Sequence, residues 1–163
     1  MGPDHASLFD ACAAALRARA PADALDEVCR LLRAGVPTYS WVGVYVVRGR
    51  KLDLAAWAGD RATEHTSIPL NTGLCGYAAS TGELVNVPDV SKDRRYLACF
   101  TETRSELVVP VLWQGTPIGE IDIDATTAAA FGPQDEVFCN RLAAEMAQAV
   151  RALQQGAWAP RAR

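Results

Sequence analysis

Apolar residues recur at helical spacing near both ends of the chain and at alternate positions in its middle. A period of about 3.6 residues indicates an amphipathic helix, whereas alternation indicates a half-buried strand. The helical spacing predicts a helix from His5 to Ala18, a second helix capped by Asp23, and a long helix from Pro133 to Leu153. Helices are therefore expected at the two ends of the chain, with strands between them.

The middle of the chain alternates in short segments bounded by glycine, proline and polar residues, as in strands joined by hairpins. A short helix that ends at Gly82 and a polar excursion from Pro88 to Phe100 interrupt the series. The predicted strands, of which the fourth is expected to be central, are Tyr39–Val47, Lys51–Trp57, Thr66–Leu70, Leu84–Val87, Leu107–Trp113 and Pro117–Asp124. This order predicts an α+β fold with an antiparallel sheet, because it lacks the regular alternation of a doubly wound fold.

Composition favours one compact domain. The chain has 163 residues, of which 50% are hydrophobic and 21% charged, enough for one core of ordinary size. With a net charge of −3 and scattered basic residues, it offers no basic stripe for a phosphate backbone, so we expect no nucleic-acid partner. No apolar run approaches the roughly 20 residues of a membrane span, and the N-terminus lacks the features of a secretory signal, so we expect no membrane association.

The five cysteines form an odd set without a CxxC pair: Cys12, Cys29, Cys75, Cys99 and Cys139. That pattern argues against a disulfide framework and a structural zinc site, and it favours a reducing cytoplasm. Cys12, Cys29 and Cys139 fall on the apolar stripes of predicted helices, where they are expected to be small buried hydrophobes.

Cys99 stands before a series of acids. Glu106 follows it on one predicted strand, and Asp122 and Asp124 share one face of the next. An odd-numbered loop around Gly115 would place Glu106 opposite Asp124, whereas an even-numbered loop would move it away. Gathered acids would repel one another and hold a proton near neutral pH, as general-acid catalysis requires. The alternative is an exposed acidic face on an edge hairpin.

Alternation also places Trp41, Gly43 and Tyr45 on one strand face, where two aromatics flanking a glycine would leave a hollow for a ligand; the alternative is that both are core residues. Cys75 lies between glycines at the start of the short helix, a position that favours a thiolate, unless the residue only fills space. A metal site formed by His65, Cys75 and Cys99 matches no zinc spacing, so we expect no metal.

Several of these segments together resemble a GAF domain, over residues 5–153. They are Trp41-Val-Gly-Val-Tyr45, Ile68-Pro-Leu-Asn-Thr-Gly-Leu-Cys75-Gly-Tyr-Ala-Ala, Val87-Pro-Asp-Val90, Cys99, Arg104-Ser-Glu106-Leu-Val-Val-Pro110, Gly119-Glu-Ile-Asp122-Ile-Asp124 and Phe131. The resemblance implies one GAF domain over residues 1–155. The tail over 156–163 has no periodicity and is predicted to be frayed, with Trp158 either exposed or resting on the body. The resemblance also implies a sheet of about six strands, with the terminal helices on one face and a ligand pocket on the other.

Within GAF domains, the chain looks most like the stand-alone free methionine-(R)-sulfoxide reductases. This resemblance implies that Cys99 attacks the sulfur of the sulfoxide and that Glu106 and Asp124 bind and protonate its oxygen. It further implies that Asp122 helps to hold the free amino acid and that Trp41 and Tyr45 enclose the methyl end. By the same resemblance, thioredoxin resets the protein, the terminal helices form a homodimer and no cofactor is needed.

Two positions depart from that family. His65 stands where the usual resolving cysteine would be, and Phe100 stands where aspartate usually follows the catalytic cysteine. Either Cys75 replaces the resolving cysteine, or an external thiol reduces the Cys99 sulfenic acid directly.

Two other functions remain open. One is a sensor that binds a nucleotide or another metabolite, and the other is a thiol redox sensor that uses Cys75 and Cys99. The Arg104–Pro110 segment occurs widely among GAF domains that only bind ligands, so it indicates fold more than activity. Bilin attachment is disfavoured, because Phe100 rather than histidine follows Cys99.

Overall fold

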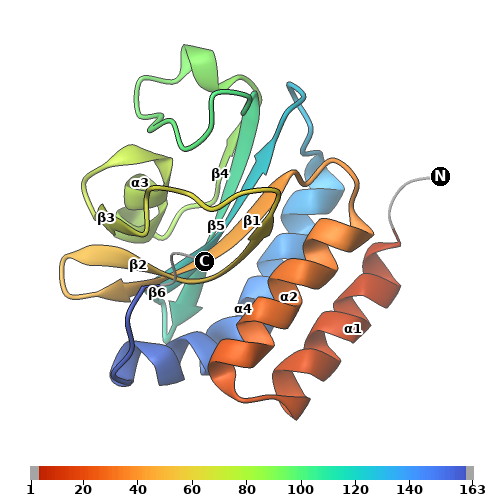
Figure 1. Ribbon diagram of the computed structural model, residues 1–163, viewed down its shortest axis with the longest axis vertical. Helices are drawn as coiled ribbons and strands as arrows, with labels where there is room; N and C mark the ends of the chain where they lie inside the picture. The colour runs from red at the N-terminus through yellow and green to blue at the C-terminus, as the bar shows by residue number, and fades with distance from the viewer. Residues whose placement is uncertain (1–3, 161–163) are drawn as a thin grey trace.

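The computed structural model describes residues 4–160, which fold around a six-stranded sheet in the order β3-β2-β1-β6-β5-β4 (Figure 1). All neighbouring strands pair antiparallel. The elements in chain order are α1 (His5–Ala18), α2 (Pro21–Gly35), β1 (Trp41–Arg48), β2 (Lys51–Gly59), β3 (Ser67–Pro69), α3 (Gly73–Thr81), β4 (Val85–Val87), the 3-10 turn η1 (Val90–Lys92), β5 (Ser105–Trp113), β6 (Thr116–Ala125) and α4 (Pro133–Gln155). The predicted α+β fold with an antiparallel sheet is confirmed.

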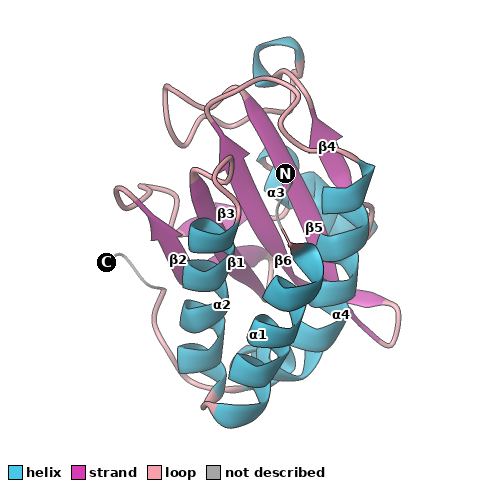
Figure 2. Ribbon diagram, turned by 90° about the vertical axis from the view of Figure 1, so that its right-hand side faces the viewer, coloured by secondary structure: helices cyan, strands magenta, loops and turns pink. Residues whose placement is uncertain are grey.

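Helices α2 and α4 cover one face of the sheet and α1 packs on both of them, as Figure 2 shows from the helix side. Apolar stripes of these helices meet inward-facing strand residues such as Val42 and Ile121 in the main core. Cys12, Cys29 and Cys139 are fully buried in this core, as the helical spacing predicted. Burial raises the pKa of Cys12 and of Cys139 to about 12, so both remain thiols at physiological pH.

The opposite face carries α3 and the segment that connects β4 to β5 (Figure 1). A second apolar cluster lies there, with members from β1, β2, α3 and β4, including Trp41, Tyr45, Leu54, Leu74 and Val85. The sheet therefore separates two apolar clusters, and only the second lies beside the acids predicted to carry the chemistry.

Two predicted details are wrong. Helix α2 begins at Pro21, with Ala20 rather than Asp23 at its N-cap, because proline suits the first helical position; Asp23 lies in the first turn, where the helix dipole favours its charge. Strand β4 is at the edge of the sheet and not at its centre. Its apolar residues are covered by the second cluster, and its Asn86 side chain donates to the Phe131 carbonyl, 3.1 Å away.

The hairpin between β5 and β6 sets the position of Glu106. Its turn is the two-residue Gln114-Gly115 with φ of 50° and 80°, as in a type I′ turn. This even-numbered loop alone would move Glu106 away from Asp124. A bulge follows, because Val111 pairs with Gly119 while Leu112 pairs with Pro117, and this leaves one extra residue on β6. The bulge restores the register, so Glu106 lies opposite Asp124.

After α4, the chain returns to the body of the domain. Trp158 is half-buried, its indole nitrogen donates to the Leu153 carbonyl at 2.7 Å, and the Arg48 guanidinium lies over its ring. Of the two alternatives for Trp158, the one in which it rests on the body is correct; the final residues of the predicted tail, 161–163, lie outside the described part. Along residues 4–160, no helix combines the length and the apolarity needed to cross a membrane.

Candidate active site

Strand register brings four acids onto the sheet face opposite α2 and α4. Across the sheet, Glu106 pairs with Asp124, and Asp124 with Trp41. On the same strand β6, Asp122 lies opposite Gly43 and Glu120 lies opposite Tyr45. The acids and the aromatics predicted from strand alternation therefore share one surface.

These acids are buried rather than solvated. The exposed fractions are 6% for Glu106, 0% for Glu120, 1% for Asp122 and 2% for Asp124. Their strands, β5 and β6, lie inside the sheet, and α3 and the β4–β5 connection cover their face. The alternative of an exposed acidic face on an edge hairpin is therefore wrong.

Burial and mutual repulsion keep protons on this cluster. Burial, followed by the charges of Asp122 and Asp124, raises the pKa of Glu106 well above its ordinary value. Burial and then Asp122 likewise raise the pKa of Asp124. Burial raises the pKa of Asp122 only to about 6, because the Cys75 and Glu106 side chains hydrogen-bond to its charged form. Asp122 is thus the least strongly shifted of the three predicted acids, and its neighbours Glu106 and Asp124 favour the protonated form.

Cys99 reaches this cluster from the connection between β4 and β5. Its half-buried thiol contacts the Leu97 carbonyl at 3.8 Å and lines a cavity of about 10 Å³ together with Cys75 and Glu106. Burial, and then the charges of Asp122, Asp124 and Glu106, raise the Cys99 pKa. Cys99 is therefore a protonated thiol at rest, and it must lose its proton before it can attack.

Trp41 and Tyr45, the two aromatics predicted on one strand face, lie beneath the β4–β5 connection. Trp41 stacks on Trp57 with 6.4 Å between ring centroids, and Phe100 lies tilted on Trp41 at 5.8 Å. The Trp41 ring lies over Gly43, where an added Cβ would be 2.3 Å from it, so the indole fills the hollow that the sequence predicted. Tyr45 is fully buried, and its hydroxyl donates to the His65 carbonyl at 2.8 Å. Both aromatics are thus core residues of the second apolar cluster.

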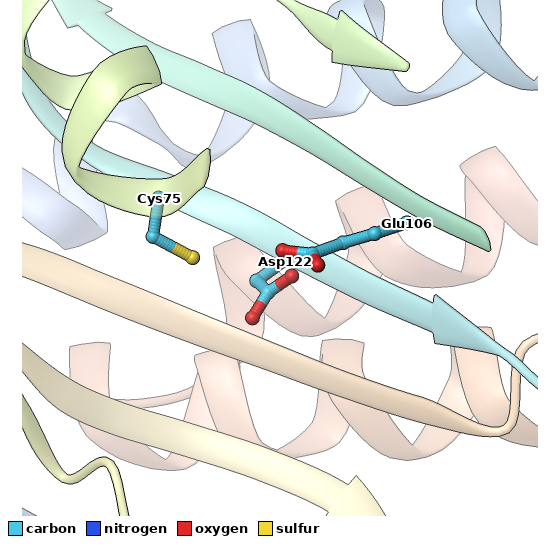
Figure 3. A group of neighbouring side chains, drawn as sticks. All are labelled: Cys75, Glu106 and Asp122. Carbon is cyan, nitrogen blue, oxygen red and sulfur yellow. The ribbon is translucent and has the colours of Figure 1, made fainter. Parts of the chain in front are cut away.

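Cys75 lies in the first turn of α3 and points toward the acids. One oxygen of Glu106, one oxygen of Asp122 and the Cys75 sulfur all lie within 4.8 Å of one another (Figure 3). Burial, and then Asp122 and Glu120, raise the Cys75 pKa well above its usual range. The thiolate expected from the helix N-terminus is therefore wrong, because burial and the nearby acids outweigh the helix dipole.

His65 is not part of a metal site with Cys75 and Cys99. Its ring Nε2 donates to the Ala98 carbonyl at 3.1 Å, which ties this loop to the segment that carries Cys99. In residues 4–160, the group with metal-ligand geometry consists of Cys75, Glu106 and Asp122, and His65 is not in it. At this position the histidine holds the loop instead of supplying a thiol.

Glu120 is the buried acid that the sequence reasoning missed. Neither of its carboxylate oxygens has a hydrogen-bond partner among the described residues. Burial raises its pKa well above the ordinary range, and contact with the Cys75 thiol opposes that rise. The signal was present in the sequence, because Glu120 precedes Asp122 by two residues and strand alternation places both on one face.

The fold and the site define a GAF domain, and a GAF family model matches residues 6–150. The chain belongs to the GAF domain family. Over 108 residues it is 39% identical to the free methionine-R-sulfoxide reductase of Saccharomyces cerevisiae, a match that spans 64% of this chain and 59% of the yeast protein.

Two solved structures are similar over most of their length. The type II free methionine-R-sulfoxide reductase of Thermoplasma acidophilum is 43% identical with a TM-score of 0.79, and the match covers 81% of this chain and 93% of that one. The free methionine-R-sulfoxide reductase of Neisseria meningitidis, in complex with its substrate, is 28% identical with a TM-score of 0.84, covering 93% of this chain and 90% of that one.

Proposed function

We propose that this protein reduces free methionine-(R)-sulfoxide to methionine. The observation that carries the proposal is the cavity shared by Cys99, Cys75 and Glu106, because it joins a nucleophile, a second thiol and an acid whose pKa is raised. The reductases from yeast and from Thermoplasma acidophilum support the choice of substrate.

In the first step, Cys99 attacks the substrate sulfur while Glu106, assisted by Asp124, gives a proton to the sulfoxide oxygen. The Cys99 thiol proton returns to the carboxyl cluster, so the cluster ends the step with as many protons as before. The oxygen passes to Cys99 as a sulfenic acid, and the substrate leaves as methionine. Cys99 is thereby oxidised by two electrons and the sulfoxide sulfur is reduced by two.

Ionised Asp122 is the group that holds the positively charged ammonium of the free amino acid, because its pKa is the least raised of the three predicted acids. Trp41 and Tyr45 provide the apolar floor for the methyl end of the substrate. The cavity beside Cys99 measures about 10 Å³, room for roughly one water molecule. Substrate entry therefore requires the segment that carries Cys99 to move.

The coupled assay for this function measures NADPH oxidation through thioredoxin reductase and thioredoxin. We expect oxidation with free methionine-(R)-sulfoxide and none with the S epimer. Absence of any R-epimer-dependent oxidation, together with no methionine formed in a single turnover of reduced protein, would overturn the proposal and favour a ligand-binding sensor.

Cys75 is proposed as the resolving thiol. Its sulfur attacks the Cys99 sulfenic acid, a disulfide forms, and the oxygen leaves as water; the dithiol of thioredoxin then reduces the disulfide. Both cysteines line the same cavity, which supports this pairing. A disulfide between Cys75 and Cys99 would complete the catalytic cycle although His65 stands where the usual resolving cysteine would be.

Cys75→Ser is expected to keep single-turnover methionine formation but to lower thioredoxin-driven turnover by at least about tenfold, because no disulfide can form. Mass spectrometry after dimedone treatment should then find the sulfenic acid trapped on Cys99. Cys12→Ala, which changes a cysteine on the opposite face of the sheet, is the matched control. Full thioredoxin-driven turnover in Cys75→Ser would show that an external thiol reduces Cys99 directly.

A further inference from the structure

Three side chains from three different elements converge with the spacing of metal ligands. Cys75 comes from α3, Glu106 from β5 and Asp122 from β6, and their donor atoms lie within 4.8 Å of one another (Figure 3). Each residue is at least nine-tenths buried. Among residues 4–160, no ion pair gives a basic partner to these acids.

The same site contains more acceptor oxygens than the protein satisfies. Oδ1 of Asp122 and both carboxylate oxygens of Glu120 have no hydrogen-bond partner in the described part of the chain. Glu120 lies against the Cys75 thiol, so its orphan oxygens belong to the same cluster. Buried polar groups are normally hydrogen-bonded, and buried charges are normally paired or coordinate a metal.

The donor set selects among cations. Magnesium and calcium prefer six or more oxygen ligands, whereas zinc takes a thiolate, carboxylates and tetrahedral geometry. Tetrahedral zinc with ordinary bond lengths holds sulfur and oxygen ligands about 3.3 to 3.6 Å apart, so the three groups must close by at most about 1.5 Å. We propose that Cys75, Glu106 and Asp122 form a zinc site, with Glu120 beside them as the fourth ligand.

The ion enters by replacing protons. Zinc binding releases the proton of the Cys75 thiol and every proton held by the ligand carboxyls, Glu120 included, so affinity rises with pH. The expectation of no metal was based on the lack of a CxxC pair and on the spacing of His65, Cys75 and Cys99. Neither observation considered Glu106 and Asp122 as ligands.

Zinc at this site also inhibits the proposed reaction reversibly, because it removes the Glu106 proton and occupies the Cys75 thiol. This second statement rests on the proposed function; the binding itself does not.

The test uses the full chain, reduced and treated with a chelator, and cobalt(II) as a spectroscopic probe for zinc. One equivalent should produce a thiolate-to-cobalt charge-transfer band in the near ultraviolet and tetrahedral d–d bands, and zinc should displace the cobalt. Cys75→Ser should lose the charge-transfer band. Glu106→Gln should weaken cobalt binding by at least about tenfold. Even the loss of a residue that only hydrogen-bonds to a metal ligand lowers affinity by about this factor.

A control variant and a second site variant guard against effects of misfolding. Cys12→Ala should retain the stoichiometry and the bands, and near-ultraviolet circular dichroism reports whether each variant folds. If Cys75→Ser does not fold, Asp122→Asn provides the second test and should weaken binding to a similar degree.

Absence of a charge-transfer band in the wild-type protein would overturn the proposal, as would a band that survives in Cys75→Ser. A protein that binds zinc stoichiometrically but turns over at an unchanged rate would overturn only the inhibition. A protein that binds cobalt but reduces neither sulfoxide epimer would leave the site in place and remove the proposed function.

Discussion

Cys99→Ser is expected to lower methionine formation by at least about a thousandfold, the scale seen when an attacking nucleophile is removed. A serine hydroxyl has no accessible anion near neutral pH and reacts poorly at sulfur, whereas Cys99 needs to lose its proton only to the neighbouring acids. The measurement is a single turnover with chromatographic detection of methionine, because this reports the first step without any reductant.

Cys12→Ala serves as the control for Cys99→Ser, since Cys12 is buried among the helices on the other face of the sheet. We expect it to react at the wild-type rate. Wild-type single-turnover rates in Cys99→Ser would exclude Cys99 as the nucleophile and leave Cys75 as the candidate.

Glu106→Gln is expected to lower the same rate by about 10² to 10⁴-fold, the usual contribution of a positioned general acid. The amide keeps the shape of the side chain but has no acidic proton. In the wild-type protein, the rate should be maintained at acid pH and fall as pH rises through the raised pKa of Glu106. The variant should lack that alkaline decline. Glu145→Gln, an exposed change on α4, is the control and should leave rate and pH profile unchanged.

The same substitution should stabilise the fold as pH rises. A buried carboxyl with a raised pKa contributes stability in its neutral form, and this contribution is lost as pH rises through the folded-state pKa. A glutamine cannot ionise and can donate to Asp122. In thermal unfolding, the stability of Glu106→Gln relative to the wild-type protein should therefore increase as pH rises. A variant that is inactive only because it is misfolded would instead lose stability at every pH.

The sequence was sufficient to predict the site face, because strand alternation depends only on the period of two. It placed Asp122 with Asp124 and Trp41 with Tyr45, and the structure agrees. It could not fix the Glu106 register, which depends on a bulge beyond an even-numbered turn. Nor could it fix the ionisation of Cys75: the helix N-terminus is visible in the sequence, but the acids that outweigh it come from β5 and β6.

The position of β4 was predicted wrongly because it, too, depends on contacts from other elements. A short apolar strand is typical of a sheet centre, but here a covering cluster and the Asn86 side chain protect an edge strand in the same way. Likewise, the hollow over Gly43 could not be excluded from the sequence, since the side chain that fills it is Trp41 itself.

The division of the molecule by its sheet also bears on how such a protein can diverge. The helices and their apolar cluster lie on one side, and the reactive groups lie on the other. Substitutions that exchange one ligand for another can therefore accumulate without disturbing the layer on which folding depends. This chain and the GAF domain of a Coxiella burnetii phosphoenolpyruvate-protein phosphotransferase share a fold with a TM-score of 0.83 at 17% identity. An architecture divided in this way can keep its shape while most of its sequence changes.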